Sequence, residues 1–224
     1  MIVTGPAAVD QVLEALTDEH TADPAAVVDA RHEYESRRGR VLQDEGLWES
    51  WSAAFIEWFL VERVAPGADG PVARQSWMRA REQGAMGDAA AAARAELLRG
   101  YLTSHRSLFE IRALDSGRVE LADLIGGAQF AVAEPRTMHG VEVGDVAELR
   151  LIGYDKDVRF GRTFVYHPAA ARAAIATHVK ALVTRGDDRR AIIDHVASLR
   201  LKIDRYKHVP PSRVYELGGG RLPE

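Results

Sequence analysis

The 224-residue sequence contains no cysteine, which excludes disulfides, thiolate zinc sites and cysteine nucleophiles. It also has no apolar run near the roughly 18 residues that a membrane span needs. Residues 1–10 lack the basic and apolar regions of a secretory signal peptide,. Together these absences predict a cytoplasmic protein that does not use a membrane as a partner.

The common catalytic and cofactor motifs are absent too. The sequence has no Gly-x-Ser-x-Gly nucleophile elbow, no glycine-rich phosphate loop and no Gly-x-Gly-x-x-Gly dinucleotide fingerprint,. None of its eight histidines has another three or four residues away, the spacing that puts two imidazoles on one helical face,. We therefore predict no catalytic residue, no cofactor and no metal site, and an enzyme of unidentified class is the second alternative.

Lysine is scarce, and the charges are unevenly distributed. Residues 1–149 hold 14 arginines and 25 acidic residues, a net charge of −11. Residues 150–213 hold 14 basic and 6 acidic residues, a net charge of +8. This asymmetry has two explanations that stay open at this stage. The basic part binds an anionic partner, or the two parts pair with each other within one fold.

The apolar residues change their spacing twice along the chain, which predicts an α+β fold. Apolar residues recur at helical spacing over 1–104, alternate over 105–167 and return to helical spacing over 168–208,. The middle segment predicts a small five-stranded antiparallel barrel or sheet, SH3-like or OB-like, because short strands alternate with glycine turns. We expect strands at about 107–114, 117–124, 128–134, 145–153 and 158–166. The helices of 168–208 should pack on the same unit, and 209–224 should be an extended or disordered tail.

An aromatic stripe marks the strongest predicted helix, about residues 47–64. Trp48, Trp51, Phe55 and Trp58 follow the three-and-four spacing of one helical face,. Such a stripe is typical of a core helix. The alternative is a face that binds a partner, since aromatic side chains also dominate protein interfaces.

Basic and aromatic residues are interleaved in the last two predicted strands and at the end of the last helix. The candidates for binding an anion or a nucleic acid are Arg150, Tyr154, Lys156, Arg159 and Lys207. Cations beside aromatics on a small barrel bind single strands by phosphate attraction and base stacking. The alternative is that the aromatics form the core and the cations cover the exterior.

Two segments carry a family resemblance. The sequence Phe-Ile-Glu-Trp-Phe-Leu-Val-Glu-Arg at residues 55–63 and the glycine-containing β-pattern of 107–132 resemble uncharacterised bacterial proteins associated with the SEC-C zinc motif. The resemblance covers about residues 46–168. Without cysteine this chain cannot carry the zinc motif itself, so the resemblance implies neither a metal site nor an activity.

These observations favour a non-catalytic macromolecule-binding or regulatory protein. The leading prediction is a protein-interaction module whose partner is another protein. Binding of single-stranded RNA or DNA through the basic C-terminal half is the alternative.

Overall fold

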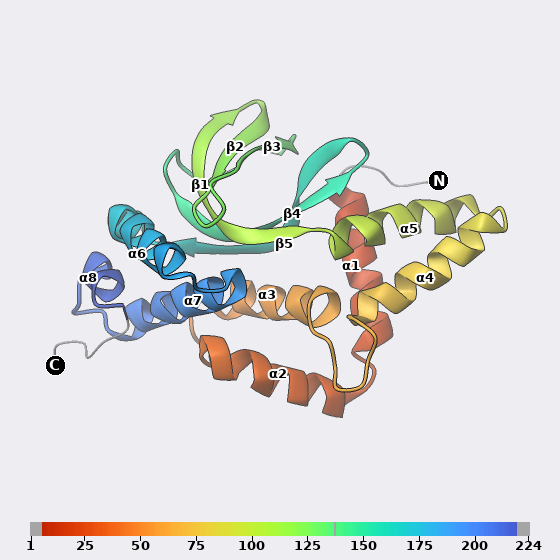
Figure 1. Cartoon of the computed structure of the whole chain (residues 1–224), viewed down its shortest axis with the longest axis horizontal. Coiled ribbons are helices and arrows are strands. Elements are labelled where there is room, and N and C mark those ends of the chain that lie inside the picture. Colours follow the sequence, from red (N-terminus) through yellow and green to blue (C-terminus); the bar gives the residue numbers. More distant parts are fainter. Residues whose placement is uncertain (1–5, 137, 219–224) are drawn as a thin grey trace.

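The computed structural model describes residues 6–136 and 138–218. Within them the chain forms eight α-helices, a short 3₁₀ helix and five β-strands (Figure 1). The N-terminal helices are α1 (Pro6–His20), α2 (Pro24–Arg38), α3 (Trp48–Val61), α4 (Val72–Ala85) and α5 (Ala89–Leu102). The strands are β1 (His105–Asp115), β2 (Gly117–Asp123), β3 (Gln129–Glu134), β4 (Val146–Tyr154) and β5 (Asp157–His167). The remaining elements are η1 (Ala169–Ala171), α6 (Arg172–Arg185), α7 (Arg189–Arg205) and α8 (Pro211–Glu216).

Local side-chain caps set several helix starts. Asp23 precedes α2, and its carboxylate accepts a hydrogen bond from the amide of Ala25 at 3.0 Å. Pro24 occupies the first position, where its missing N–H costs nothing,. Asp88 and Asp188 cap α5 and α7 in the same way. Each aspartate satisfies amide groups that a helix start leaves without a partner.

The strands form one antiparallel sheet in the order β3-β2-β1-β4-β5. This confirms the predicted α+β class and the five antiparallel strands. Of the two predicted forms, barrel or sheet, the open sheet is found. Strands β3 and β5 approach each other, but no ladder joins them within the described residues. Met138 and Val141, from the connection between β3 and β4, pack on the apolar core of the curled sheet, so loop side chains rather than a closing ladder complete it.

Helices cover one side of the sheet in layers (Figure 1). Helices α3 and α7 lie beneath it, and α2 lies below them. The largest apolar core joins α1–α5 to the sheet through Ile152, Tyr154 and Val165. A second core joins α6, α7 and α8 to Leu108 and Val146 of β1 and β4. None of the described helices combines the length and apolar character that crossing a bilayer requires.

The segment after α7 differs from the predicted extended or disordered tail of 209–224. Residues 211–216 form the helix α8, with Val214 and Tyr215 buried. The hydroxyl of Tyr215 lies 2.7 Å from Nδ1 of the buried His167. The prediction failed because it followed the two prolines and the glycines and gave no weight to these two apolar anchors. Residues 219–224 lie outside the described part of the chain.

Candidate anion-binding site

The aromatic stripe of α3 is mainly core. Trp51, Phe55 and Trp58 are at most 4% exposed, and Phe55 meets the ring of Tyr34 edge to face at 5.5 Å between centroids. Trp48 alone of the four predicted face residues is partly exposed, and it lines a cleft of about 630 Å³. The burial of three rings favours the core interpretation of the stripe over a partner-binding face.

The five predicted anion-binding residues do not share one surface. Arg150 and Tyr154 are buried, at 2% and 7% exposure, and the Arg159 guanidinium lies 3.0 Å from the Asp157 carboxylate. Lys156 and Lys207 are exposed, but the β4–β5 turn and the end of α7 lie on opposite sides of the molecule (Figure 1). These placements provide no continuous groove for a nucleic-acid backbone.

Ion pairs between the two parts of the chain account for much of the charge asymmetry. Arg150 pairs with Glu57 at 3.1 Å, and Arg205 pairs with Glu45 at 2.9 Å. Arg162 reaches Glu14 at 3.4 Å. In each pair an arginine of the basic C-terminal part contacts an acid of the N-terminal part. The structure therefore favours the second explanation, in which the two parts pair with each other.

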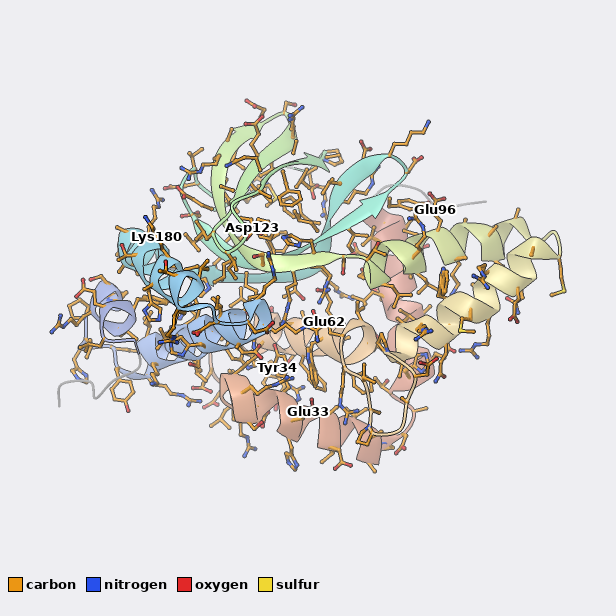
Figure 2. The ribbon with its side chains drawn as sticks, viewed as in Figure 1. Glu33, Tyr34, Glu62, Glu96, Asp123 and Lys180 are labelled. Carbon is orange, nitrogen blue, oxygen red and sulfur yellow. The ribbon has the colours of Figure 1, made fainter. Side chains whose placement is uncertain are left out.

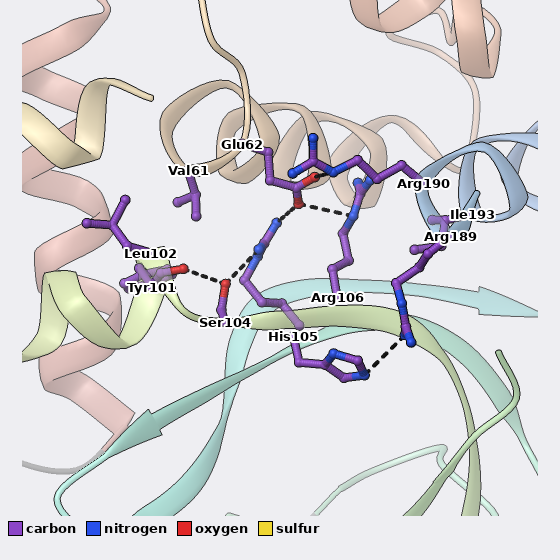
Figure 3. Close-up of a pocket in the computed structure, with 11 residues that line it drawn as sticks. Val61, Glu62, Tyr101, Leu102, Ser104, His105, Arg106, Arg189, Arg190 and Ile193 are labelled. Carbon is purple, nitrogen blue, oxygen red and sulfur yellow. Dashed lines mark hydrogen bonds and ion pairs between the residues drawn. The ribbon is translucent and has the colours of Figure 1, made fainter. Parts of the chain in front are cut away.

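One cavity concentrates arginines that are distant in the sequence. It has a volume of about 200 Å³ and lies where the ends of α3 and α5 meet the starts of β1 and α7 (Figure 3). Its lining is Val61, Glu62, Tyr101, Leu102, Ser104, His105, Arg106, Arg150, Arg189, Arg190 and Ile193. Four arginines and one histidine thus face a single acid, Glu62. We call this cavity the arginine pocket.

Glu62 lies at the centre of the arginine pocket, where α3, α7 and the sheet meet (Figure 2). Its Oε1 is 3.2 Å from Nε of Arg106 and accepts a short hydrogen bond from Arg150. Arg150 also donates to the hydroxyl of Ser104 at 2.7 Å. Burial opposes the charged form of Glu62, but Arg106 and Arg150 outweigh it and lower its pKa to about 2. Glu62 is therefore an anion at neutral pH.

A second ion-pair group adjoins the pocket and is centred on two fully buried side chains. Both terminal nitrogens of Arg38 donate hydrogen bonds to the Glu148 carboxylate, at 2.6 and 3.0 Å. One of these nitrogens also donates to Asp194 at 3.1 Å. Arg106 reaches the same Glu148 at 3.4 Å. Arg38 and Glu148 have no exposed side-chain surface. Arg106 therefore joins the pocket to a buried network linking α2, β4 and α7.

The mouth of the pocket is formed by the first turn of α7 and the start of β1. Arg189 donates to Ser107 at 2.9 Å and to Asp123 at 3.0 Å. His105 Nε2 lies 2.9 Å from the same Asp123 carboxylate. Arg190 is the most open, with 65% of its side chain exposed and its Nε 3.7 Å from Glu62, beyond hydrogen-bond distance. Its guanidinium donors are therefore available to a ligand.

The geometry does not form a Ser-His-Asp catalytic triad. In a triad the histidine lies between the serine and the aspartate, whereas here Asp123 lies between Ser107 and His105. Ser107 is fully buried and donates to Asp123 at 2.6 Å. Burial opposes ionisation of Asp123, but hydrogen bonds from Ser107, the Gly126 backbone and Arg189 lower its pKa to about 2. A carboxylate with so low a pKa, whose oxygens already accept several hydrogen bonds, is a weak base and is poorly suited to take a proton from a substrate.

Three buried titratable groups predict that stability falls in acid. The folded-state pKa values of Glu62 and Asp123 are about 2, and that of the buried His167 is about 3. Since all three lie below their unfolded values, the unfolded chain binds more protons as the pH falls. The free energy of unfolding should decline below about pH 6.5, where His167 of the unfolded chain takes up a proton. It should decline more steeply from about pH 5 to pH 2, where the carboxylates do the same, and Glu62 alone accounts for a loss of roughly 3 kcal/mol. The free energy of unfolding in urea, measured at pH 7.5, 5.5 and 3.5, tests this decline.

A His167→Gln variant provides the control for that experiment. It should flatten the decline between pH 7.5 and 5.5 and leave the steeper decline below pH 5. A free energy of unfolding that stayed constant down to pH 3.5 would contradict the assignment of these carboxylates as ionised and buried.

Sequence reasoning missed most of this site. It named Arg150 as an anion-binding candidate, but together with residues that lie elsewhere on the molecule, and it did not single out Arg106, Arg189 or Arg190 as a group. One signal was present. Arg189 and Arg190 follow Asp188 directly, and a helix that begins at this capping aspartate has two arginines on its first turn.

The chain matches no protein-family model, no curated protein and no solved structure.

Proposed function

We propose that this chain is a non-catalytic binding protein whose ligand places a phosphate or carboxylate group in the arginine pocket. The observation that carries the proposal is the convergence of Arg106, Arg150, Arg189 and Arg190 on one open cavity with a single acid in its lining. Guanidinium groups present donors in a fixed fork that matches carboxylate and phosphate oxygens. The proposal keeps the binding role expected from the sequence but assigns it to a different part of the molecule.

The size and walls of the pocket limit the ligand. The volume of about 200 Å³ is below the roughly 300–1,000 Å³ of sites that enclose drug-sized molecules. Val61, Leu102 and Ile193 supply apolar surface beside the arginines. The pocket therefore suits a small anion, or the anionic end of a larger ligand with a short apolar portion next to it.

The charges behind the pocket keep the expected affinity modest. Arg150 is already paired with Glu57, and Arg189 with Asp123. The charge of these arginines is therefore largely balanced by protein carboxylates. A bound anion is stabilised more by hydrogen bonds than by net electrostatic attraction. The open guanidinium of Arg190 should contribute most, because it gives up no short contact to bind.

Replacing Arg190 by alanine tests the proposal. Thermal unfolding is followed while sodium phosphate is raised at constant ionic strength. The wild-type midpoint should rise and then saturate, because a ligand of the folded state stabilises it by mass action. Arg190→Ala should weaken the apparent affinity by about tenfold, since a hydrogen bond to a charged group contributes roughly 1.5–3 kcal/mol.

The matched control is Arg213→Ala. Arg213 is similarly exposed, lies on α8 and pairs with Glu216 at 3.1 Å. It should leave the phosphate response unchanged. Equal losses in both variants would show that phosphate acts through general surface charge, and the proposal would then fail.

A further inference from the structure

Two histidines that are far apart in the sequence face each other between α6 and α7. The Nε2 atoms of His178 and His195 are 3.0 Å apart, and the ring centroids are 5.2 Å apart. The two helices form an antiparallel hairpin closed at Gly186, which adopts the left-handed conformation. Residues 178 and 195 stand at nearly equal distances from that turn, so the hairpin brings them together.

The separation of the two rings suits a shared metal ion. One tetrahedral ion with Zn–N distances of roughly 2.0–2.1 Å holds two imidazole nitrogens about 3.3 Å apart and their ring centroids about 5.2 Å apart. The centroids already have that separation. The two rings now face each other nearly head-on, so an ion between them requires the nitrogens to move apart by about 0.3 Å and each ring to turn by roughly 30°.

The two imidazoles share one hydrogen bond, in which the Nε2–H of one ring donates to the Nε2 of the other. Burial lowers the pKa of His178, and the proximity of His195 lowers it further. Burial lowers the pKa of His195 as well, with Lys202 and Arg185 acting in the same direction and Asp187 against them. Each ring is therefore neutral at pH 7, and a neutral imidazole binds a metal through the nitrogen that carries no proton. An ion between the two Nε2 atoms replaces their hydrogen bond, and the donating ring then carries its proton on Nδ1,. Each is also only partly buried, so an ion can enter from solvent.

We propose that His178 and His195 form a binding site for one divalent transition-metal ion. Imidazole is a good ligand for zinc, nickel and copper, and Cu²⁺ binds nitrogen ligands more tightly than Ni²⁺ does. The described residues contain no group of three or more histidine and acidic side chains that could hold a metal. The site therefore supplies two protein ligands, and water completes the coordination. It is independent of the arginine pocket.

The nearest carboxylate does not complete the site. Asp187 is close enough to influence His195 electrostatically, but Arg185 holds it through two hydrogen bonds, one of them at 2.8 Å. A site with two protein ligands should bind more weakly than a four-ligand structural zinc site. It should also retain exchangeable water positions.

Isothermal titration with NiCl₂ and with ZnCl₂ tests the site in the full chain at pH 7.5. The expected result is one ion bound per chain by the wild-type protein. His178→Gln and His195→Gln should each reduce the affinity at least tenfold. His32→Gln is the control, because His32 is exposed on α2, and it should leave binding unchanged.

A measurement on the unaltered protein guards against a folding defect in the variants. Substoichiometric Cu²⁺, a paramagnetic ion, should broaden the imidazole proton signals of His178 and His195 before those of the other histidines. The proposal is overturned by the absence of saturable binding, by binding that survives both substitutions, or by broadening that begins at other histidines.

Discussion

Replacing Arg38 by alanine is expected to lower the free energy of unfolding by about 3–5 kcal/mol, the range for removing one partner of a buried ion pair. The Arg38 side chain is completely buried and bonds to Glu148 and Asp194. Its guanidinium also lies 5.0 Å from the ring centroids of Tyr34 and Trp51. Without it, the fully buried Glu148 carboxylate loses its main partner and keeps only Arg106 at 3.4 Å.

Arg37 provides the matched control, since it is the same residue type one position earlier on α2. Its side chain is 41% exposed, and its ion pairs with Glu33 and Asp194 are both at 3.7 Å. Arg37→Ala should cost less than about 1 kcal/mol, as exposed pairs do. Urea unfolding at pH 7.5 compares the two variants. Equal costs would contradict the assignment of Arg38 to a buried network.

Replacing Glu62 by glutamine is expected to tighten phosphate binding about tenfold. Glu62 is the acid in the lining of the arginine pocket and contacts Arg106, Arg150 and Arg190. Its carboxylate therefore competes with an external anion for the same guanidinium groups. The amide keeps the shape and removes the charge, and a gain of about 1.4 kcal/mol corresponds to a tenfold change in affinity.

The same substitution should lower the free energy of unfolding, because two buried arginines lose a charged partner. Opposite changes in stability and affinity distinguish a ligand site from a purely structural ion cluster. Glu45→Gln is the control, since Glu45 pairs with Arg205 away from the pocket, and it should leave phosphate affinity unchanged. Weaker phosphate binding by Glu62→Gln would show that Glu62 holds the arginines in place and does not compete with phosphate for them.

Local signals made much of the fold predictable. The alternation from Ser107 onward and the turns at Gly117 and Gly127, both with positive φ, gave all five strands to within two residues of their observed ends. The aspartate caps and Pro24 at helix starts are signals of the same kind. Each of these signals acts over a few neighbouring residues, so a single sequence carries it completely.

The candidate site was much less predictable, because it is assembled from distant segments. The sequence predicts Arg150 as an anion-binding cation in a basic stretch, but tertiary packing places it between Glu57 and Glu62, about 90 residues earlier. The pairing of His178 with His195 likewise depends on how two helices pack. The expectation of no metal site came from searching for two histidines on one helix, which cannot detect a pair shared between two.

The most direct test of the arginine pocket is a two-dimensional ¹H–¹⁵N NMR titration of the wild-type protein with phosphate at constant ionic strength. We expect saturable shifts at the backbone amides of residues 104–106 and 189–193, which surround the pocket. Shifts confined to exposed lysines such as Lys156 and Lys207, or shifts that never saturate, would contradict this expectation.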